Sequence, residues 1–156
     1  MALIRTNLVN EIRAIIDLEY TAHAGFPGST AETAARWATA VNNYASLVTP
    51  PSVTSAAAYA AFQNTLLGMD ANSGNGVAIF TSAFTAYAAA LAPGMAPAFA
   101  ATPPPIPIQL GTIIPSLGVG GATAQAIAES MATIIDTWFR TGIAVNNTSG
   151  ATIPWS

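Results

Sequence analysis

One long stretch of the chain is almost free of charge, and this feature limits the possible folds most strongly. Asp70 is the only charged residue between Trp37 and Ala128. A soluble domain normally carries mixed charges over its surface, and near-neutral apolar patches mark interfaces. The stretch is therefore either covered by copies of the chain or by partner proteins, or it belongs to an unusually apolar monomer coated with Ser, Thr, Asn and Ala. We favour the covered surface.

Composition excludes several classes of function. The chain has 156 residues, of which 7% are charged, with a net charge of −3, one histidine, no lysine and no cysteine. This length suits one domain. The missing cysteines exclude disulfides, zinc-thiolate sites and thiol nucleophiles, and one histidine excludes a two-histidine metal site. An acidic chain without lysine is a poor match for nucleic acid, so no nucleic-acid partner is expected.

Five segments show the apolar spacing of amphipathic helices. In the second segment, Ser29 followed by Glu32 is typical of a capping box, and Glu32 and Arg36 form an i,i+4 pair in the favoured order. The predicted helices are Leu3–Ala22, Ser29–Val48, Val53–Met69, Val77–Ala92 and Ala124–Thr141.

Residues 93–121 break this pattern because they contain seven of the eleven prolines. The run from Thr102 to Leu110 predicts extended or polyproline II chain. Ile106, Ile108 and Leu110 favour a segment strapped across a surface. The alternative is that the three consecutive prolines dock into an aromatic groove of a partner.

The C-terminal residues 143–156 contain no charge and predict a short β-hairpin or an extended arm. We expect Val145, Ile153 and Trp155 to contact a neighbouring subunit, with Trp155 as the anchor. The alternative is a tail folded back on its own bundle. The predicted fold is mainly α: a bundle of about five helices in residues 1–142, with the proline-rich crossover, and a separate arm in residues 143–156.

No set of residues predicts catalysis. His23 lies at the predicted end of the first helix, where a cation meets the negative end of the helix dipole. A Ser-His-Asp triad would pair it with Asp17 or Asp70, but no serine has the surrounding glycines of a nucleophile elbow. Glu129 and Asp136 share a helix face, yet both are expected in solvent, with Arg140 beside Asp136. The chain is therefore expected to be no enzyme, with no cofactor, no metal and no small-molecule substrate.

A membrane span is also not expected. Val77–Ala92 is sixteen residues without a charge, and Pro93 follows it. Spanning a bilayer takes about 20 strongly apolar residues, so a buried helix is the better interpretation. The N-terminus lacks the basic and apolar regions of a signal peptide.

In four motifs the sequence resembles small alanine-rich proteins of tailed bacteriophages. The motifs are TWFRTGIAVNN at 137–147, GATIPWS at 150–156, NLVNEIR at 7–13 and GFPG at 25–28. The resemblance implies a virion component, made in the host cytoplasm, that assembles with copies of itself and other virion proteins and has no catalytic residues. Its place in capsid, neck, tail or baseplate stays open.

The residues expected at the interfaces of such a subunit are apolar ones of the proline-rich segment and the arm: Ile106, Ile108, Leu110, Val145, Ile153 and Trp155. Two other functions remain open. A subunit of a non-viral filament or surface layer would share the composition, and a membrane-active protein such as a holin would need a true spanning helix.

Overall fold

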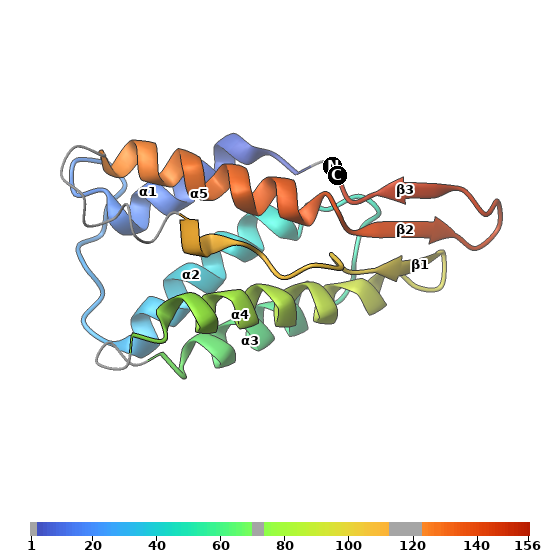
Figure 1. Ribbon diagram of the computed structural model, residues 1–156, viewed down its shortest axis with the longest axis horizontal. Helices are drawn as coiled ribbons and strands as arrows, with labels where there is room; N and C mark the ends of the chain where they lie inside the picture. Colours follow the sequence, from blue (N-terminus) through green and yellow to red (C-terminus); the bar gives the residue numbers. More distant parts are fainter. Residues whose placement is uncertain (1–2, 70–73, 113–122) are drawn as a thin grey trace.

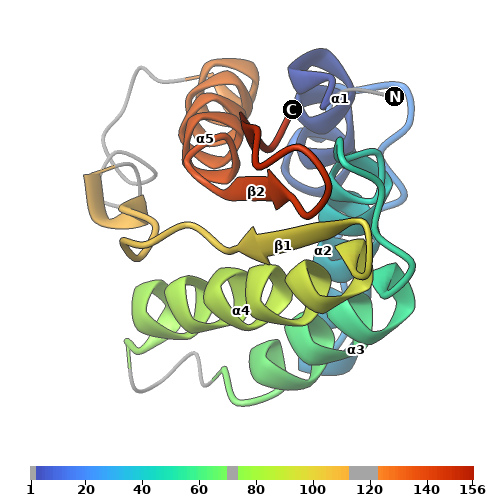
Figure 2. The ribbon, with the colours of Figure 1, turned by 90° about the vertical axis from the view of Figure 1, so that its right-hand side faces the viewer.

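A computed structural model describes residues 3–69, 74–112 and 123–156, and in these residues five α-helices form two layers (Figure 1). In one layer α1 packs against α5, in the other α3 packs against α4, and α2 contacts both α1 and α3. In Figure 2, α1 and α5 lie above β1, and α3 and α4 lie below it. The helices are α1 (Arg5–Ile16), α2 (Thr30–Ala45), α3 (Ser55–Leu66), α4 (Gly76–Leu91) and α5 (Ala124–Phe139). The predicted mainly helical fold is confirmed.

The start of α2 follows the predicted capping box with one difference. The Ser29 hydroxyl accepts a hydrogen bond from the Glu32 amide at 3.1 Å. The Glu32 carboxylate reaches one residue further back than in the standard box and accepts from the Gly28 amide at 2.8 Å. Glu32 also pairs with Arg36, as predicted.

The first helix ends earlier than the predicted Ala22. Asp17 has extended backbone angles, φ −105° and ψ 100°, and ends α1. Its carboxylate accepts from Arg13 Nε at 2.9 Å and from the Glu19 amide at 3.2 Å. An aspartate that bonds nearby backbone amides competes with helix continuation, which explains the shorter helix.

Aromatic side chains fill the space between the layers. The Phe62 ring meets Phe84 edge-on at 5.0 Å, and the Phe139 ring lies 6.0 Å from both Tyr44 and Tyr87. These rings come from α2, α3, α4 and α5, so one core joins both layers. Edge-to-face packing at these separations is the favourable arrangement for aromatic pairs.

The C-terminal end of α4 is completed by another part of the chain. Ser52 Oγ donates to the Leu91 carbonyl at 2.6 Å, and Thr54 Oγ1 donates to the Ala90 carbonyl at 2.7 Å. These carbonyls lack partners within a helix, so the two hydroxyls cap it. A 3₁₀ turn, η1 (Ala92–Met95), follows α4.

The proline-rich segment forms a strand and then runs along the gap between the layers (Figure 1). Strand β1 (Phe99–Thr102) comes first, and a 3₁₀ turn, η2 (Leu110–Thr112), comes last. Between them Ile108 is buried and Trp138 Nε1 donates to the Ile106 carbonyl at 2.6 Å. The predicted strap is thus present up to residue 112; its remainder and Asp70 lie outside the described residues.

The predicted C-terminal hairpin is also present, and it is part of a larger sheet. Strands β2 (Ile143–Asn146) and β3 (Thr152–Pro154) pair antiparallel, and β1 adds to the other edge of β2 with Ala101 opposite Ala144. The sheet order is β1-β2-β3. The sequence did not predict β1, because its partner lies far along the chain.

Candidate functional site

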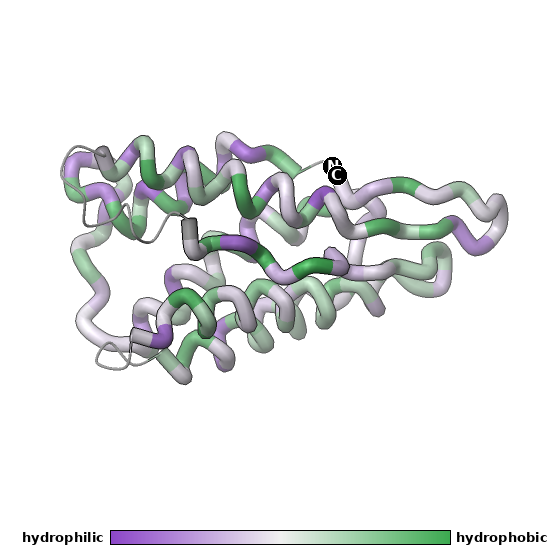
Figure 3. Tube along the Cα trace, in the orientation of Figure 1, coloured by the Kyte–Doolittle hydropathy of each residue, from purple (hydrophilic) through white to green (hydrophobic). Residues whose placement is uncertain are grey.

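The layer formed by α3 and α4 presents a face without charge. In the described residues, every charged side chain lies on α1, α2 or α5, at Arg140 directly after α5, or in the connection from α1 to α2. Figure 3 shows hydrophilic stretches along α1 and α5. We call the exposed side chains of α3 and α4 the neutral face; they are Ala56, Ala57, Ala60, Asn64, Ala78, Ser82, Thr85 and Ala89.

A shallow apolar groove lies beside the strap, on a different side of the molecule. It has a volume of about 340 Å³ and lies between the strap and α5. Ile106, exposed over 66% of its surface, forms one wall, and Ile134 and Trp138 line the α5 side. Among the described residues no charged side chain lines the groove, and its polar lining residues are Gln109, Thr133, Thr137 and Thr141, so it offers mainly apolar contact.

The six predicted interface residues do not form one surface. Ile106 is exposed as expected, and Val145 and Ile153 are half-buried. Ile108 and Leu110 are buried in the core of the same chain, which corrects their assignment as contact residues. Ile108 and Leu110 are two residues apart and so share the buried face of the extended segment, with the exposed Gln109 between them. Ile106 departs from this alternation, since residues 105–107 are all exposed.

Trp155 requires the largest correction. Its side chain is fully buried and stacks on Phe139 with ring centroids 6.4 Å apart. The next residue, Ser156, exchanges two backbone hydrogen bonds with Thr49, of 2.7 and 3.1 Å. The structure thus agrees with the alternative, a tail folded back on its own bundle. Residues 143–156 do not form a separate arm, and Trp155 is not free to anchor a neighbouring subunit.

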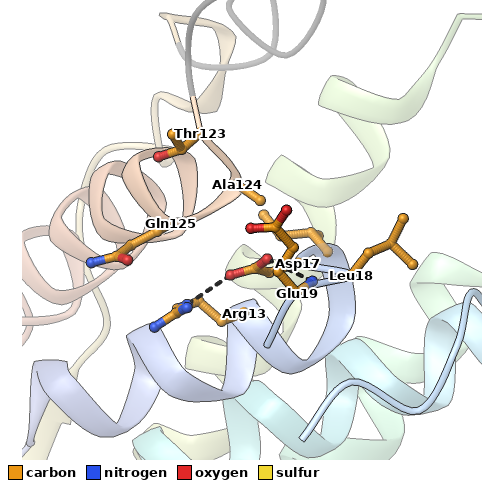
Figure 4. Close-up of a pocket in the computed structure, with 8 residues that line it drawn as sticks. Arg13, Asp17, Leu18, Glu19, Thr123, Ala124 and Gln125 are labelled. Atoms are coloured by element: carbon orange, nitrogen blue, oxygen red, sulfur yellow. Dashed lines mark hydrogen bonds and ion pairs between the residues drawn. The ribbon is translucent and has the colours of Figure 1, made fainter. Parts of the chain in front are cut away.

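A larger pocket of about 470 Å³ lies where the end of α1 meets the start of α5 (Figure 4). Thr123 and Gln125 line it from the α5 side, and Asp17 and Glu19 from the α1 side. The carboxylate of Asp17 is already bonded to Arg13 and to the Glu19 amide. The described lining thus leaves no buried polar group free to bind a ligand.

Asp136 lies at the centre of a half-buried polar cluster. It accepts from Tyr44 Oη at 2.6 Å and from Arg140 Nε at 2.8 Å, while Arg140 Nη2 donates to the Leu3 carbonyl at 3.0 Å. The cluster therefore joins α2, α5 and the N-terminal segment. The predicted Asp136–Arg140 pair is present, but the expectation of a solvated Asp136 was wrong, since its side chain is only 14% exposed.

The surroundings shift the pKa values of this cluster. Burial opposes ionisation of Asp136, but the hydrogen bonds from Arg140 and Tyr44 outweigh burial and hold its pKa below the ordinary value. Burial, reinforced by Asp136, raises the pKa of Tyr44, so the phenol stays neutral. Glu129 is exposed and accepts from Gln125, so the two carboxylates do not face a common cleft. The cluster fits a structural role.

His23 lies beyond the end of α1, in the connection to α2. Its Nδ1 accepts from the Gly25 amide at 3.0 Å, and its ring meets Phe26 edge-on at 5.4 Å. Its bonded contacts are local, and neither Asp17 nor a serine is among them. Within the described ranges no three His, Cys, Asp or Glu side chains gather as a metal site would require.

One helical stretch, Gly76–Met95, is long and apolar enough by length and composition to cross a membrane. Its inner side is packed into the core through Phe84, Tyr87 and Leu91.

Comparisons with protein families, with curated proteins and with solved structures found no match for this chain.

Proposed function

We propose that this chain is a non-enzymatic structural subunit that assembles with copies of itself and with neighbouring proteins, as a component of a bacteriophage virion. The observation that carries the proposal is the neutral face on α3 and α4. The resemblance of the helical and C-terminal motifs to small phage proteins supports the virion as its location.

The placement of charge favours this face for contacts between copies. Each copy carries a net charge of −3, so like copies repel when their charged surfaces meet. Joining the neutral faces keeps α1 and α5 of each copy on the outside. Covering Ala, Ser and Thr costs little side-chain entropy and leaves no charged group desolvated.

Insertion of single charges tests which face is used. We expect Ala57→Glu on α3 and Ser82→Glu on α4 to abolish self-association, because a glutamate would be buried without a partner. Thr133→Glu, exposed on α5, is the matched control and is expected to assemble like the unchanged chain. Sedimentation velocity measures assembly, and circular dichroism checks that each variant keeps its helices.

Two results would contradict the proposal. One is an unchanged chain that stays monomeric at high concentration and enters no particle. The other is equal assembly by all three variants. Mass spectrometry of purified virions, with the copy number of the chain, tests the location directly.

A second candidate function rests on the Gly76–Met95 helix. Because this stretch has the length and composition of a span, a membrane-active protein is the main alternative. Flotation with liposomes separates the two. A structural subunit stays at the bottom of the gradient, whereas a chain that inserts α4 moves with the lipid and exposes Phe84 and Tyr87.

A further inference from the structure

The connection between α1 and α2 is held by a hydrogen bond that only an unprotonated histidine can accept. His23 Nδ1 accepts from the Gly25 amide at 3.0 Å. Gly25 has a φ of +82°, a left-handed conformation in which the chain reverses direction. The backbone amide of His23 donates to the Tyr20 carbonyl at 2.9 Å, which holds the backbone of His23 at this turn.

Protonation reverses the chemistry of this contact. A neutral imidazole has one acceptor nitrogen and one N–H donor, whereas the imidazolium has two donors and no acceptor. With a proton on Nδ1, the ring and the Gly25 amide would present two donors to each other. The other nitrogen, Nε2, is buried without a hydrogen-bond partner, so it offers no compensating contact.

We propose that His23 is a pH-sensitive latch that holds the turn at Gly25 when the imidazole is neutral and releases it on protonation. The released segment would carry Phe26, whose ring contacts His23 and whose surface is 65% exposed. The inference is independent of the proposed assembly function.

The charges around the turn favour release in acid. The Arg36 guanidinium of α2 donates to the Gly25 and Ala24 carbonyls, so a protonated His23 would add a second positive charge beside it. The nearby carboxylates are engaged elsewhere or exposed: Glu32 with Arg36 and Gly28, Glu11 with Asn43, Asp17 with Arg13, and Glu19 on the surface.

The Glu32 carboxylate, which accepts from the Gly28 amide at the other end of the turn, stays ionised when the histidine is protonated. The Gly28 amide, followed by Arg36, lowers the pKa of Glu32 below its ordinary value. Histidine is the side chain whose charge ordinarily changes between about pH 5 and 8. Acidification that protonates the imidazole therefore changes the latch, while the lowered pKa of Glu32 keeps the Glu32–Arg36 pair ionised.

Two substitutions at one position give the test. In His23→Asn the amide oxygen takes the place of Nδ1 and accepts from the amide two residues on, as in an Asx turn, but it does not titrate. In His23→Ala the acceptor is absent at every pH. Amide hydrogen exchange at Gly25, expressed as a protection factor, is measured at pH 8 and pH 5 in full-length protein.

We expect the unchanged chain to match His23→Asn at pH 8 and His23→Ala at pH 5. Its Gly25 protection should fall roughly two- to tenfold, the effect of one lost hydrogen bond, while amides in α2 and α5 stay protected. Equal protection of the unchanged chain at both pH values would overturn the latch. A matching fall in His23→Asn would do so as well, because that variant has no titrating acceptor.

Discussion

Gly142 and Trp155 face each other so closely that a Cβ atom at position 142 would lie 2.5 Å from the Trp155 ring. The Trp155 amide also donates to the Gly142 carbonyl at 2.9 Å. The Trp155 ring therefore packs directly against the backbone of Gly142, the glycine that ends the turn after α5. Only a residue without a side chain lets the C-terminal segment approach α5 in this way.

Gly142→Ala is expected to lower the free energy of unfolding by about 1–3 kcal/mol, the usual cost of overpacking a core. Chemical denaturation followed by Trp fluorescence measures the change. Gly76→Ala is the matched control, because a Cβ there meets nothing within 4 Å and alanine favours a helix. Equal losses in both variants would show that the contact with Trp155 is unimportant.

Trp155→Ala is expected to cost roughly 3–5 kcal/mol, since it empties a fully buried site against Phe139. Deletion of residues 143–156 should be at least as damaging, because it also removes β2 from the edge of β1. The melting temperature of each variant measures the loss. Ile106→Ala, at an exposed position, should change stability by less than about 0.5 kcal/mol. A truncated chain that melts cooperatively at the original temperature would contradict this.

The Asp136 carboxylate should make stability depend on pH. Its pKa in the folded chain lies below the ordinary 3.8, so its stabilising effect is complete above that value and disappears as the pH falls through the lower folded pKa. Asp136→Asn should lose about 1–2 kcal/mol near neutral pH, with a smaller difference from the unchanged chain as pH falls from 4 to 2. Urea denaturation at each pH measures this difference.

Glu129→Gln is the control for that series, since Glu129 is an exposed carboxylate on the same helix. Its stability should follow the unchanged chain at every pH. A difference between Asp136→Asn and the unchanged chain that is constant from pH 7 to pH 2 would contradict the role assigned to the Asp136 charge.

The two hydroxyls that cap α4 should contribute non-additively to stability. Ser52→Ala removes the shorter side-chain hydrogen bond to the Leu91 carbonyl, which Thr54 Oγ1 also reaches at 3.3 Å, and Thr54→Val removes the side-chain donor to the Ala90 carbonyl. Each change is expected to cost about 1 kcal/mol. The two hydroxyl oxygens lie 3.1 Å apart, so the double variant should deviate from the sum of the single ones. Thermal unfolding of the four proteins in this cycle gives the coupling, and strict additivity would show that the two caps act independently.

The helices could be predicted from the sequence because their signals are local. Ser29 and Glu32 mark the start of α2 within four residues, and the apolar spacing of α5 places Ile135 and Trp138 in the core. The predicted ends of the helices agree less well with the structure than their positions do. Asp17 stops α1 through its own side-chain bonds, and this competition with the helix leaves no mark in the apolar pattern.

The sheet and the polar cluster could not be predicted because their partners are distant. Tyr44 and Asp136 are 92 residues apart, and nothing near either residue signals the other. The uncharged C-terminal segment was expected to contact a neighbouring subunit, but the structure buries its Trp155 in the core of the same chain. Its composition fits a neighbour's surface and its own core equally well, and the space beside Gly142 decides between them.

The order of strands along the chain has a consequence for biosynthesis. α3 and α4 are consecutive, so they can pair as soon as both leave the ribosome, whereas β1 waits for β2 until residues 143–146 are made. During that interval the β1 edge is a template for any β2 segment, including one from another nascent chain. Slower translation after Thr102 is therefore expected to lengthen the period in which this edge is exposed.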